Sequence, residues 1–479
     1  MRAWFWCGVG AVLSLSAGCV VVDDDDPDKD NGEAGDSSTG GRDSSGGTEG
    51  ETTGGRETAG GTGGENTGGR APTGGREGDG GAGNAGGEAN DNTGGTPDDN
   101  AGGEAGGGSE PTGPVDCTDA ETLPERIEED LEIGPGCVRV DRTIVIAQAK
   151  LTIAPGTTLK FAPAGYLDLE LAALSALGTE QAPIVFTSES DSPLPGDWQC
   201  VYLDRQSTDV EIRHGVFEYG GDGCDANGAR NEGLLIIDGA ARAVTNSVFR
   251  HSLTNGVSLL REGNVRTFEN NRFEQNQVAP LRVAAPQILA LGTGLDFQGS
   301  EPILVDTTYD IDKTGTWRAQ SVPFHVVGKL NIGGDAEVTI EAGTRIELDG
   351  NSVEVYNANL ISAGTAEAPV VFTSAFASPG PGDWGCVTIG STTGTPRFDH
   401  TIFEYAGNGQ GCTGNAEGAL NVPSSAIIRD STFRQIDGFA IQSRDCDPDW
   451  CENQFEEVKT GPLSCDSPSV ASACPLEVE

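Results

Sequence analysis

The amino-acid sequence predicts an all-β fold, a parallel β-helix that follows a long disordered N-terminal linker. Two observations carry this prediction: the chain after residue 115 contains two long copies of one sequence, and each copy contains a shorter repeat marked by phenylalanine. No segment shows a sustained helical period with capping residues, which a helical repeat protein would need. Short strands that stack coil upon coil therefore account best for the sequence.

The chain begins with a segment typical of protein export. Arg2 is followed by an apolar run, Ala3–Leu15, and by the small residues Ser16–Gly18. A basic start, a short apolar stretch and small residues before a cut site indicate a secretory signal peptide over residues 1–18. The apolar run is too short to remain as a membrane-spanning helix.

The residues before Cys19 resemble the bacterial lipobox, in which the cysteine is diacylated and becomes the mature N-terminus. Here Leu15 stands four residues before the cysteine, where the usual lipobox has its leucine three before. Ordinary secretion is therefore the alternative. We expect lipidation of Cys19 to hold the protein in the bacterial cell envelope, at the outer membrane or the cell surface.

Residues 19–115 form an acidic linker. Between Asp23 and Pro114 there is no Ile, Leu, Met, Val, Phe, Trp or Tyr, and Gly, Thr, Asp, Glu, Asn and Ala predominate. Such a segment has no apolar surface to bury against the entropy cost of ordering, so we expect it to be disordered. The net charge of the whole chain, −45, excludes nucleic acid as an expected partner, because phosphates require cationic neutralisation.

Residues 116–479 carry the duplication, with copies at about 138–322 and 323–460 and a cap at each end. The same residue types recur at an offset of 186 positions. Matching pairs include Gly178/Gly364, Pro183/Pro369, Trp198/Trp384, Cys200/Cys386 and the Phe-Glu-Tyr motifs at 217–219 and 403–405. We expect both copies to share one architecture.

Within each copy a phenylalanine recurs every 22–32 residues. The series are Phe217, Phe249, Phe273 and Phe297, then Phe403, Phe433 and Phe455. Strand–turn–strand units of this length cannot bury their own apolar faces, so they must stack on their neighbours. We expect each phenylalanine to stack on the next inside the solenoid, and the polar residue three positions before it to lie at a bend. An array of β-sandwiches is the alternative.

Several motifs carry a family resemblance. The sequences GT-x-L-x-F, LGTE-x-APIVFTS, PGDW and FEY resemble the right-handed parallel β-helix repeats of bacterial cell-surface lipoproteins, whose fold is pectin-lyase-like. The resemblance covers about residues 138–460 and implies this fold and a place in the cell envelope. It implies little about activity, since the function of that family is largely uncharacterised.

Ten cysteines follow residue 116, and an even number in an exported protein indicates disulfides. Because both pairs stand at matching places in the two copies, we predict Cys200–Cys224 and Cys386–Cys412. Neighbour pairing predicts Cys117–Cys137, Cys446–Cys451 and Cys465–Cys474. The segment 117–137 is expected to form a short helix that caps the first coil, and residues 446–479 the opposite cap.

Catalytic residues are not isolated by the sequence. Glycoside hydrolysis requires two carboxylates that flank the scissile bond. The best candidates, Asp197, His214 and Glu218, all recur in the second copy as Asp383, His400 and Glu404. A duplicated residue favours a role in the shared coil geometry, and Asp in a Pro-Gly-Asp-Trp turn commonly bonds its own backbone. We predict no catalytic residue and expect a protein that is not an enzyme.

Two binding features remain. Asp445, Asp447, Asp449 and Glu452 suit calcium, which takes six to eight oxygen ligands from flexible loops; a solvated disulfide loop is the alternative. Trp317 and Trp450 are not duplicated, so we expect them to be exposed and to stack on sugar rings. Trp198 and Trp384 are expected to pack against the coil. No cofactor is expected, and calcium at this acidic segment is the alternative.

These features together predict a lipid-anchored envelope protein that binds polysaccharide, or another cell-surface protein, without catalysis. An exported polysaccharide lyase or glycoside hydrolase on the same fold is one alternative, which rests on fold analogy alone. An adhesin or extracellular-matrix component is the other.

Overall fold

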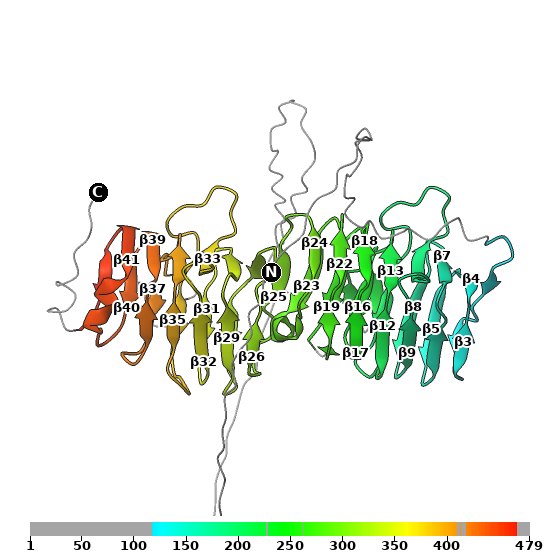
Figure 1. Cartoon of the computed structure of the whole chain (residues 1–479), viewed down its shortest axis with the longest axis horizontal. Helices are drawn as coiled ribbons and strands as arrows, with labels where there is room; N and C mark the ends of the chain where they lie inside the picture. Colours follow the sequence, from blue (N-terminus) through cyan, green and yellow to red (C-terminus); the bar gives the residue numbers. More distant parts are fainter. Residues whose placement is uncertain (1–116, 227–228, 262, 410–411, 413–417, 467–479) are drawn as a thin grey trace, which may run out of the picture. The chain divides into compact units, whose positions relative to one another are not determined.

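The computed structural model describes residues 117–466 except 227–228, 262, 410–411 and 413–417. Within these residues the regular secondary structure is almost entirely β-strand, and strands on successive coils pair in parallel. The predicted parallel β-helix is therefore confirmed (Figure 1). The predicted signal peptide, Cys19, the linker and Cys474 lie outside the described residues.

Three parallel sheets form the faces of the first copy. The first has eight strands: β1 (Glu121–Thr122), β4 (Gly136–Val140), β7 (Thr157–Phe161), β10 (Ile184–Ser188), β13 (Gly215–Glu218), β18 (Val248–Arg250), β22 (Arg272–Glu274) and β24 (Asp296–Gln298). The seven-stranded sheet comprises β3 (Leu131–Ile133), β6 (Lys150–Ile153), β9 (Ala173–Leu177), β12 (Val210–Arg213), β17 (Ala240–Thr245), β20 (Asn264–Val265) and β21 (Phe268–Glu269).

The fourteen-stranded sheet runs through both copies. Its strands in the first copy are β2 (Arg126–Ile127), β5 (Thr143–Ala147), β8 (Tyr166–Glu170), β11 (Val201–Leu203), β16 (Leu235–Ile237), β19 (Asn255–Leu259), β23 (Ala279–Ala284) and β25 (Ile303–Asp306). It continues through β27 (Phe324–Val327), β30 (Arg345–Leu348), β33 (Val370–Ser374), β36 (Thr401–Glu404), β39 (Thr432–Ile436) and β41 (Gln454–Val458).

Two further sheets complete the second copy. The five-stranded sheet comprises β26 (Gly315–Trp317), β29 (Glu337–Glu341), β32 (Asn359–Ala363), β35 (Arg397–Asp399) and β38 (Ile427–Arg429). The six-stranded sheet comprises β28 (Leu330–Ile332), β31 (Val353–Val355), β34 (Val387–Ile389), β37 (Gly418–Asn421), β40 (Phe439–Gln442) and β42 (Gly461–Ser464). The remaining elements are an antiparallel hairpin, β14 (Cys224–Ala226) and β15 (Ala229–Asn231), and two 3-10 helices, η1 (Ala285–Ala290) and η2 (Pro448–Glu452).

The phenylalanines stack inside the solenoid as predicted. Phe217 lies between Phe186 and Phe249, with ring centroids 4.1 and 5.0 Å away, and the stack continues through Phe273 to Phe297. A second stack joins Phe372, Phe403, Phe433 and Phe455. Both stacks fill the centre with rings in offset or parallel contact, which stabilises neighbouring coils beyond the area they bury.

The predicted bends also occur. His214, Asn246 and Asn270 adopt the left-handed conformation, with φ of 49°, 52° and 55°, whereas Glu452, three positions before Phe455, ends the 3-10 helix η2 instead. His400 and Asp430 do the same in the second copy. Asn, Asp and His tolerate this conformation better than other residues with a Cβ, so the repeat reserves these positions for them.

The two copies occupy different faces of the solenoid. β10 and β33 carry the same Val-Phe-Thr-Ser sequence, yet β10 belongs to the eight-stranded sheet and β33 to the fourteen-stranded sheet. The change falls where β24 ends the eight-stranded sheet and β25 pairs with β27. The second copy is therefore turned by about a third of a revolution about the axis relative to the first.

The first coil corrects one prediction. Residues 117–137 form strands β1, β2 and β3 rather than a capping helix. Leu123, Ile127 and Ile133 are buried, while Glu128, Glu129 and the other charged residues between them are exposed. These apolar residues each pack at a different face of the coil, a spacing that a single helix face would not serve.

The disulfides confirm three predicted pairs and correct two. Cys117–Cys137, Cys200–Cys224 and Cys386–Cys412 are bonded as expected. Cys446 instead bonds Cys465, with Cα atoms 5.7 Å apart, so Cys446–Cys451 and Cys465–Cys474 are wrong. The reason is coil geometry: Cys446 follows β40 and Cys465 follows β42, and these two strands are paired neighbours. Among the described residues, no helix has the length and apolar character needed to cross a membrane.

Candidate binding surface

Trp317 and Trp450 are not exposed, which corrects the predicted ligand-binding role. Each has 1% of its surface accessible. Trp317 lies on β26 in the coil where the two copies meet and packs edge-on against Phe324, and Trp450 is the buried residue of η2. Both occur once because the junction and the cap occur once. Trp198 and Trp384 are buried as expected, and their indole nitrogens donate to the carbonyls of Glu218 and Glu404 at 2.8 Å.

The acidic segment near the C-terminal cap is not gathered into one site. Asp445, Asp449 and Glu452 are exposed, and Asp447 accepts a hydrogen bond from the backbone nitrogen of Asp449, which caps η2. The part of the chain that the structure describes contains no group of three or more His, Cys, Asp or Glu side chains placed to hold a metal ion.

The duplicated acids form the same network in both copies. Asp197 accepts from the Ser188 hydroxyl at 2.7 Å and from the Leu194 amide at 2.9 Å, which closes the loop before the Pro-Gly-Asp-Trp turn. Asp383 accepts from Ser374 and Gly380 in the same way. Because these bonds recur wherever the loop recurs, they fix loop geometry.

A row of polar side chains crosses the outer face of the eight-stranded sheet. Its members occupy successive register positions from β4 to β24, and we call them the outer row: Arg139, Lys160, Thr187, Glu218, Arg250, Glu274 and Gln298. At about 4.8 Å between strands, the row extends about 29 Å along the solenoid. Arg139 and Lys160 provide donors at one end, Thr187 and Glu218 in the middle are buried, and Arg250, Glu274 and Gln298 add donors and acceptors towards the other end.

The middle of the outer row is held by charge-assisted hydrogen bonds. Glu218 accepts from the Thr187 hydroxyl at 2.9 Å and from Arg250 Nε at 2.8 Å, and its side chain is mostly buried. The second copy repeats this triad with Thr373, Glu404 and Arg434. These groups are pre-ordered, so binding there costs little further side-chain entropy.

The basic end of the outer row lies in a hollow of about 1040 Å³. Arg139 pairs with Glu189, with nitrogen–oxygen distances of 2.7 and 2.8 Å, and Lys160 Nζ donates to the Ser188 carbonyl at 3.0 Å. No carboxylate of the described residues forms an ion pair with Lys160. Asp197 also lines this hollow.

This basic end belongs to the first copy alone. The corresponding row on the fourteen-stranded sheet has His325 and Glu347 where the first copy has Arg139 and Lys160. The charge at the second position is therefore reversed between the copies. The two basic side chains in the hollow are therefore not a feature that the two copies share.

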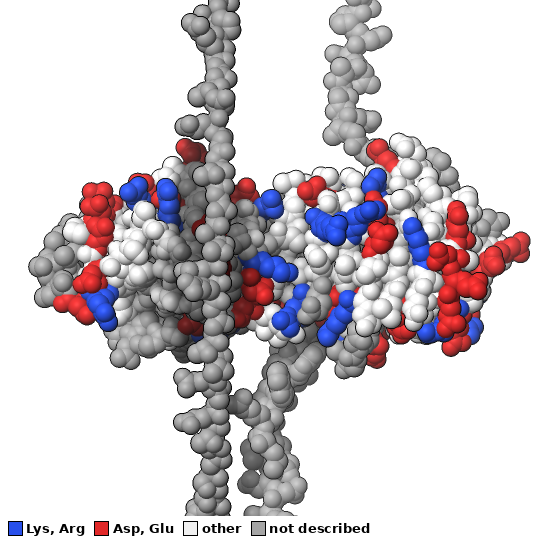
Figure 2. All heavy atoms as spheres, turned by 90° about the horizontal axis from the view of Figure 1, so that it is seen from below, with Lys and Arg blue, Asp and Glu red and all other residues white. Residues whose placement is uncertain are grey.

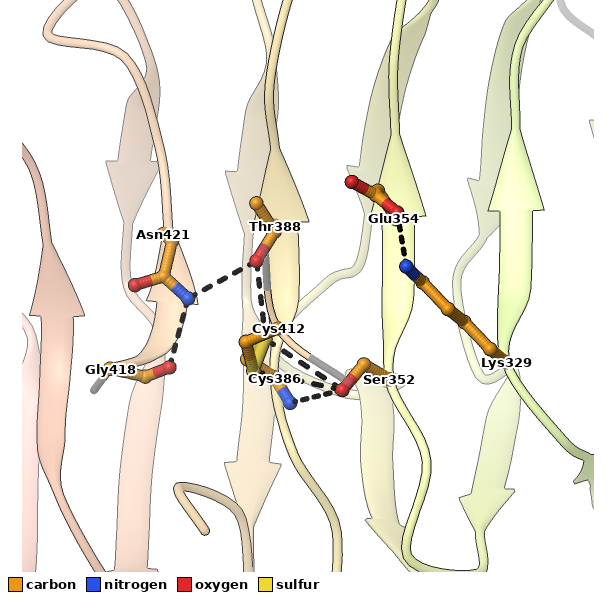
Figure 3. Close-up of a disulfide and its surroundings, with 8 residues drawn as sticks. All are labelled: Lys329, Ser352, Glu354, Cys386, Thr388, Cys412, Gly418 and Asn421. Carbon is orange, nitrogen blue, oxygen red and sulfur yellow. Dashed lines mark hydrogen bonds and ion pairs between the residues drawn. A yellow bond between two sulfur atoms is a disulfide. The ribbon is translucent and has the colours of Figure 1, made fainter. Parts of the chain in front are cut away.

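The disulfide insertions cover a different face. Cys200–Cys224 holds the β14–β15 hairpin over the outer side of β11 and β16, where Tyr202 and Ile236 are fully buried beneath it. Cys386–Cys412 lies at the corresponding place in the second copy, next to Ser352, Thr388 and Asn421 (Figure 3). The same covalent clamp thus lies on an apolar surface in one copy and on a polar surface in the other.

Charged groups of both signs share the surface of the solenoid. Figure 2 shows Lys and Arg interspersed with Asp and Glu on the face in view, with acidic side chains gathered at the end formed by the first coils. Glu125, Glu128, Glu129 and Asp130 are exposed in that first coil. The basic pair Arg139 and Lys160 stands on the next two strands of the adjoining sheet, close to this acidic end.

Comparison with known proteins agrees with the fold. A family model described as a pectate-lyase-like β-helix domain matches residues 310–408. No curated protein and no solved structure matches the chain. The matched segment lies mostly in the second copy and excludes the hollow, so it supports the fold and leaves activity open.

Proposed function

We propose that this β-helix is anchored in the cell envelope through Cys19 and binds polysaccharide along the outer row, without cleaving it. The observation that carries the proposal is the hollow that contains Arg139 and Lys160 at one end of a continuous polar row. A linear polymer of sugars offers hydroxyl and ring oxygens at regular intervals, which suits donors and acceptors repeated from strand to strand.

Binding is favoured over catalysis because two of the three carboxylates that line the hollow, Glu189 and Asp197, are already engaged, which leaves Asp191 without a second free carboxylate there. Glu189 is paired with Arg139, one oxygen of Asp197 holds Ser188 and Leu194, and Glu218 holds Thr187 and Arg250. A glycosidase needs one carboxylic acid to give a proton and a second carboxylate free to act on the opposite side of the bond. None of these three groups is free in that sense.

The N-terminal segment supports the proposed location. A Gly-rich coil of the length of residues 19–115 has an end-to-end distance of about 50–60 Å. A tether of that reach would hold the β-helix away from the membrane surface. The excess of negative charge would also keep it from lying on anionic lipid headgroups.

The proposal is tested with the purified full-length protein on a panel of neutral and acidic polysaccharides, with calcium and with chelator. We expect retention on at least one polysaccharide, with no new reducing ends and no unsaturated sugars. Product formation would show that the chain is a lyase or hydrolase instead. Retention of another cell-surface protein without any polysaccharide would favour an adhesin and overturn the proposal.

A further inference from the structure

Each coil of the second copy passes through three sheets in a fixed order. From β27 to β38 the chain visits the fourteen-stranded, the six-stranded and then the five-stranded sheet. In the next coil, after β39 and β40, the 3-10 helix η2 takes the place of a strand of the five-stranded sheet. It contacts β38, and the side-chain nitrogen of Asn453, the residue after η2, donates to the Ile428 carbonyl of β38 at 3.2 Å.

The described residues end before the final coil reaches this third side. Its strands β41 and β42 pair with β39 and β40, and the pairing continues past β42, where the Asp466 amide donates to the Arg444 carbonyl at 2.9 Å. Asp466 therefore lies beside Arg444, one coil beyond the residues that lead into η2. Cys451 stands seven positions after Arg444, and Cys474 stands eight positions after Asp466.

Cys451 belongs to a disulfide whose partner is none of the eight cysteines paired above. It is half-buried in η2, packs against the core and is disulfide-bonded. The four bonds described above use every other cysteine between residues 117 and 466. Cys474, which lies outside the described residues, is the remaining cysteine of residues 116–479.

We propose that Cys451 and Cys474 form a fifth disulfide, which joins the C-terminal segment to η2 at the end of the solenoid. Neighbouring strands lie about 4.8 Å apart and the Cα atoms of a disulfide about 4.4–6.8 Å apart, so cysteines on successive coils are at bonding distance. Cys446–Cys465, with Cα atoms 5.7 Å apart, already joins these two coils in this way. Eight extended residues span up to about 26 Å, so the chain after Asp466 is long enough.

The bond forms by oxidation outside the cytoplasm. Each thiol loses one hydrogen as the sulfur–sulfur bond forms, and the two electrons and two protons pass to the disulfide of an exported thiol oxidoreductase, which becomes a dithiol. The pairing therefore belongs to the exported protein, and the same thiols should remain reduced in chains retained in the cytoplasm.

The position of the bond fits the needs of a solenoid end. β41 and β42 are the last described strands of their sheets. Open strand edges can pair with other chains, and a terminal repeat needs a cap over its exposed face. A disulfide from η2 to the segment after Asp466 would hold such a cap on the side of the five-stranded sheet.

The experiment is disulfide mapping of the purified, exported full-length protein, alkylated without reduction. Trypsin together with a protease that cleaves before Asp places each cysteine of this region on its own peptide: residues 445–446, 449–459, 460–465 and 466–479. We expect 449–459 to be linked to 466–479. The link between 445–446 and 460–465 is the internal control, because the structure contains Cys446–Cys465. Alkylated Cys451 or Cys474, or a link from Cys451 to Cys19, would overturn the proposal.

A second measurement separates a bond from two independent contributions. We expect Cys451→Ser, Cys474→Ser and the double variant to lower the midpoint of thermal unfolding by the same several degrees. Each single variant should gain one thiol that reacts with a thiol reagent, and the double variant none. Additive shifts in the double variant, or single variants without a new thiol, would contradict the pairing. Neither measurement depends on polysaccharide binding.

Discussion

Asp168 and Glu354 occupy equivalent positions in the two copies and differ in their partners. Glu354 on β31 forms an ion pair with Lys329, the residue directly before the neighbouring strand β28 (Figure 3). The first copy has Thr143 at the position of Lys329, so Asp168 has no basic partner there. Burial, followed by the charges of Glu170 and Asp204, raises the pKa of Asp168 to about 6.

This raised pKa predicts a pH-dependent stability. In the unfolded chain the pKa of Asp is about 3.9, so the folded state holds this proton more tightly. The stabilising contribution is present in full below about pH 4 and is lost as the pH rises through about 6. Asp168→Asn should therefore raise the free energy of unfolding at pH 7 by about 1–2 kcal/mol, after allowance for solvent screening.

The measurement is urea unfolding of wild type and variant at pH 4 and pH 7, with Glu354→Gln as the paired-acid control. The gain should vanish at pH 4, and the control should show no gain at either pH. An equal effect of Asp168→Asn at both pH values would contradict the assignment.

Among the elements, the stack of phenylalanines joins coil to coil. Every ring from Phe186 to Phe297 lies against the ring of the preceding coil, and the strands that carry them pair in parallel register. Each coil contacts only its neighbours, so loss of one ring weakens two coil interfaces.

Phe217→Ala tests this role. We expect the free energy of unfolding to fall by about 3–5 kcal/mol, because a buried ring with partners on both sides leaves a cavity. Phe376→Ala is the matched control, since Phe376 is 50% exposed, and should change stability by less than about 0.5 kcal/mol. Denaturant unfolding measures both. If both variants lowered the free energy of unfolding by a similarly small amount, the stack would not have the stabilising role assigned to it.

The repeats in the sequence predicted the features that recur in every coil or in both copies. The phenylalanine spacing implied the stack, and the duplicated cysteines implied Cys200–Cys224 and Cys386–Cys412. The first coil was missed because its strands are only two or three residues long and their apolar residues are too few to show alternation. The absence of a counterpart in the other copy did not indicate that a tryptophan is exposed, since Trp317 and Trp450 are buried core residues of the junction and the cap.

The candidate site was less predictable for a physical reason. Arg139 and Lys160 are 21 positions apart and become neighbours only through the register of β4 and β7. Their spacing in the sequence does not distinguish these two basic residues from the other basic residues that point outward on other coils. The reversed charge at Glu347 was the available signal, and it has meaning only once the strands of the two copies are matched.

For the whole molecule, the turn between the copies makes them unequal. Equivalent strands lie on different sheets, so the two polar rows face different directions and end in different residues. The row in the first copy thus ends in the basic pair Arg139 and Lys160, and the row in the second copy has His325 and Glu347 at those positions.

The proposed attachment of the whole molecule to the envelope is tested at Cys19. We expect Cys19→Ala to move the protein from the membrane fraction to the soluble fraction and to abolish incorporation of labelled palmitate. Immunoblots of separated cell fractions and labelling with palmitate give the result. A wild-type protein that is soluble and unlabelled would instead indicate ordinary secretion.

The most direct test of polysaccharide binding at the outer row exchanges the residue that distinguishes the copies. Retention of full-length protein is measured on the polysaccharide that holds the wild type, for Lys160→Glu and for the reciprocal Glu347→Lys. Both residues already occur at equivalent strand positions, so the fold should accept each change. We predict that Lys160→Glu weakens retention about tenfold and that Glu347→Lys leaves it unchanged. Equal retention of Lys160→Glu and wild type would contradict a binding site in the hollow of the first copy.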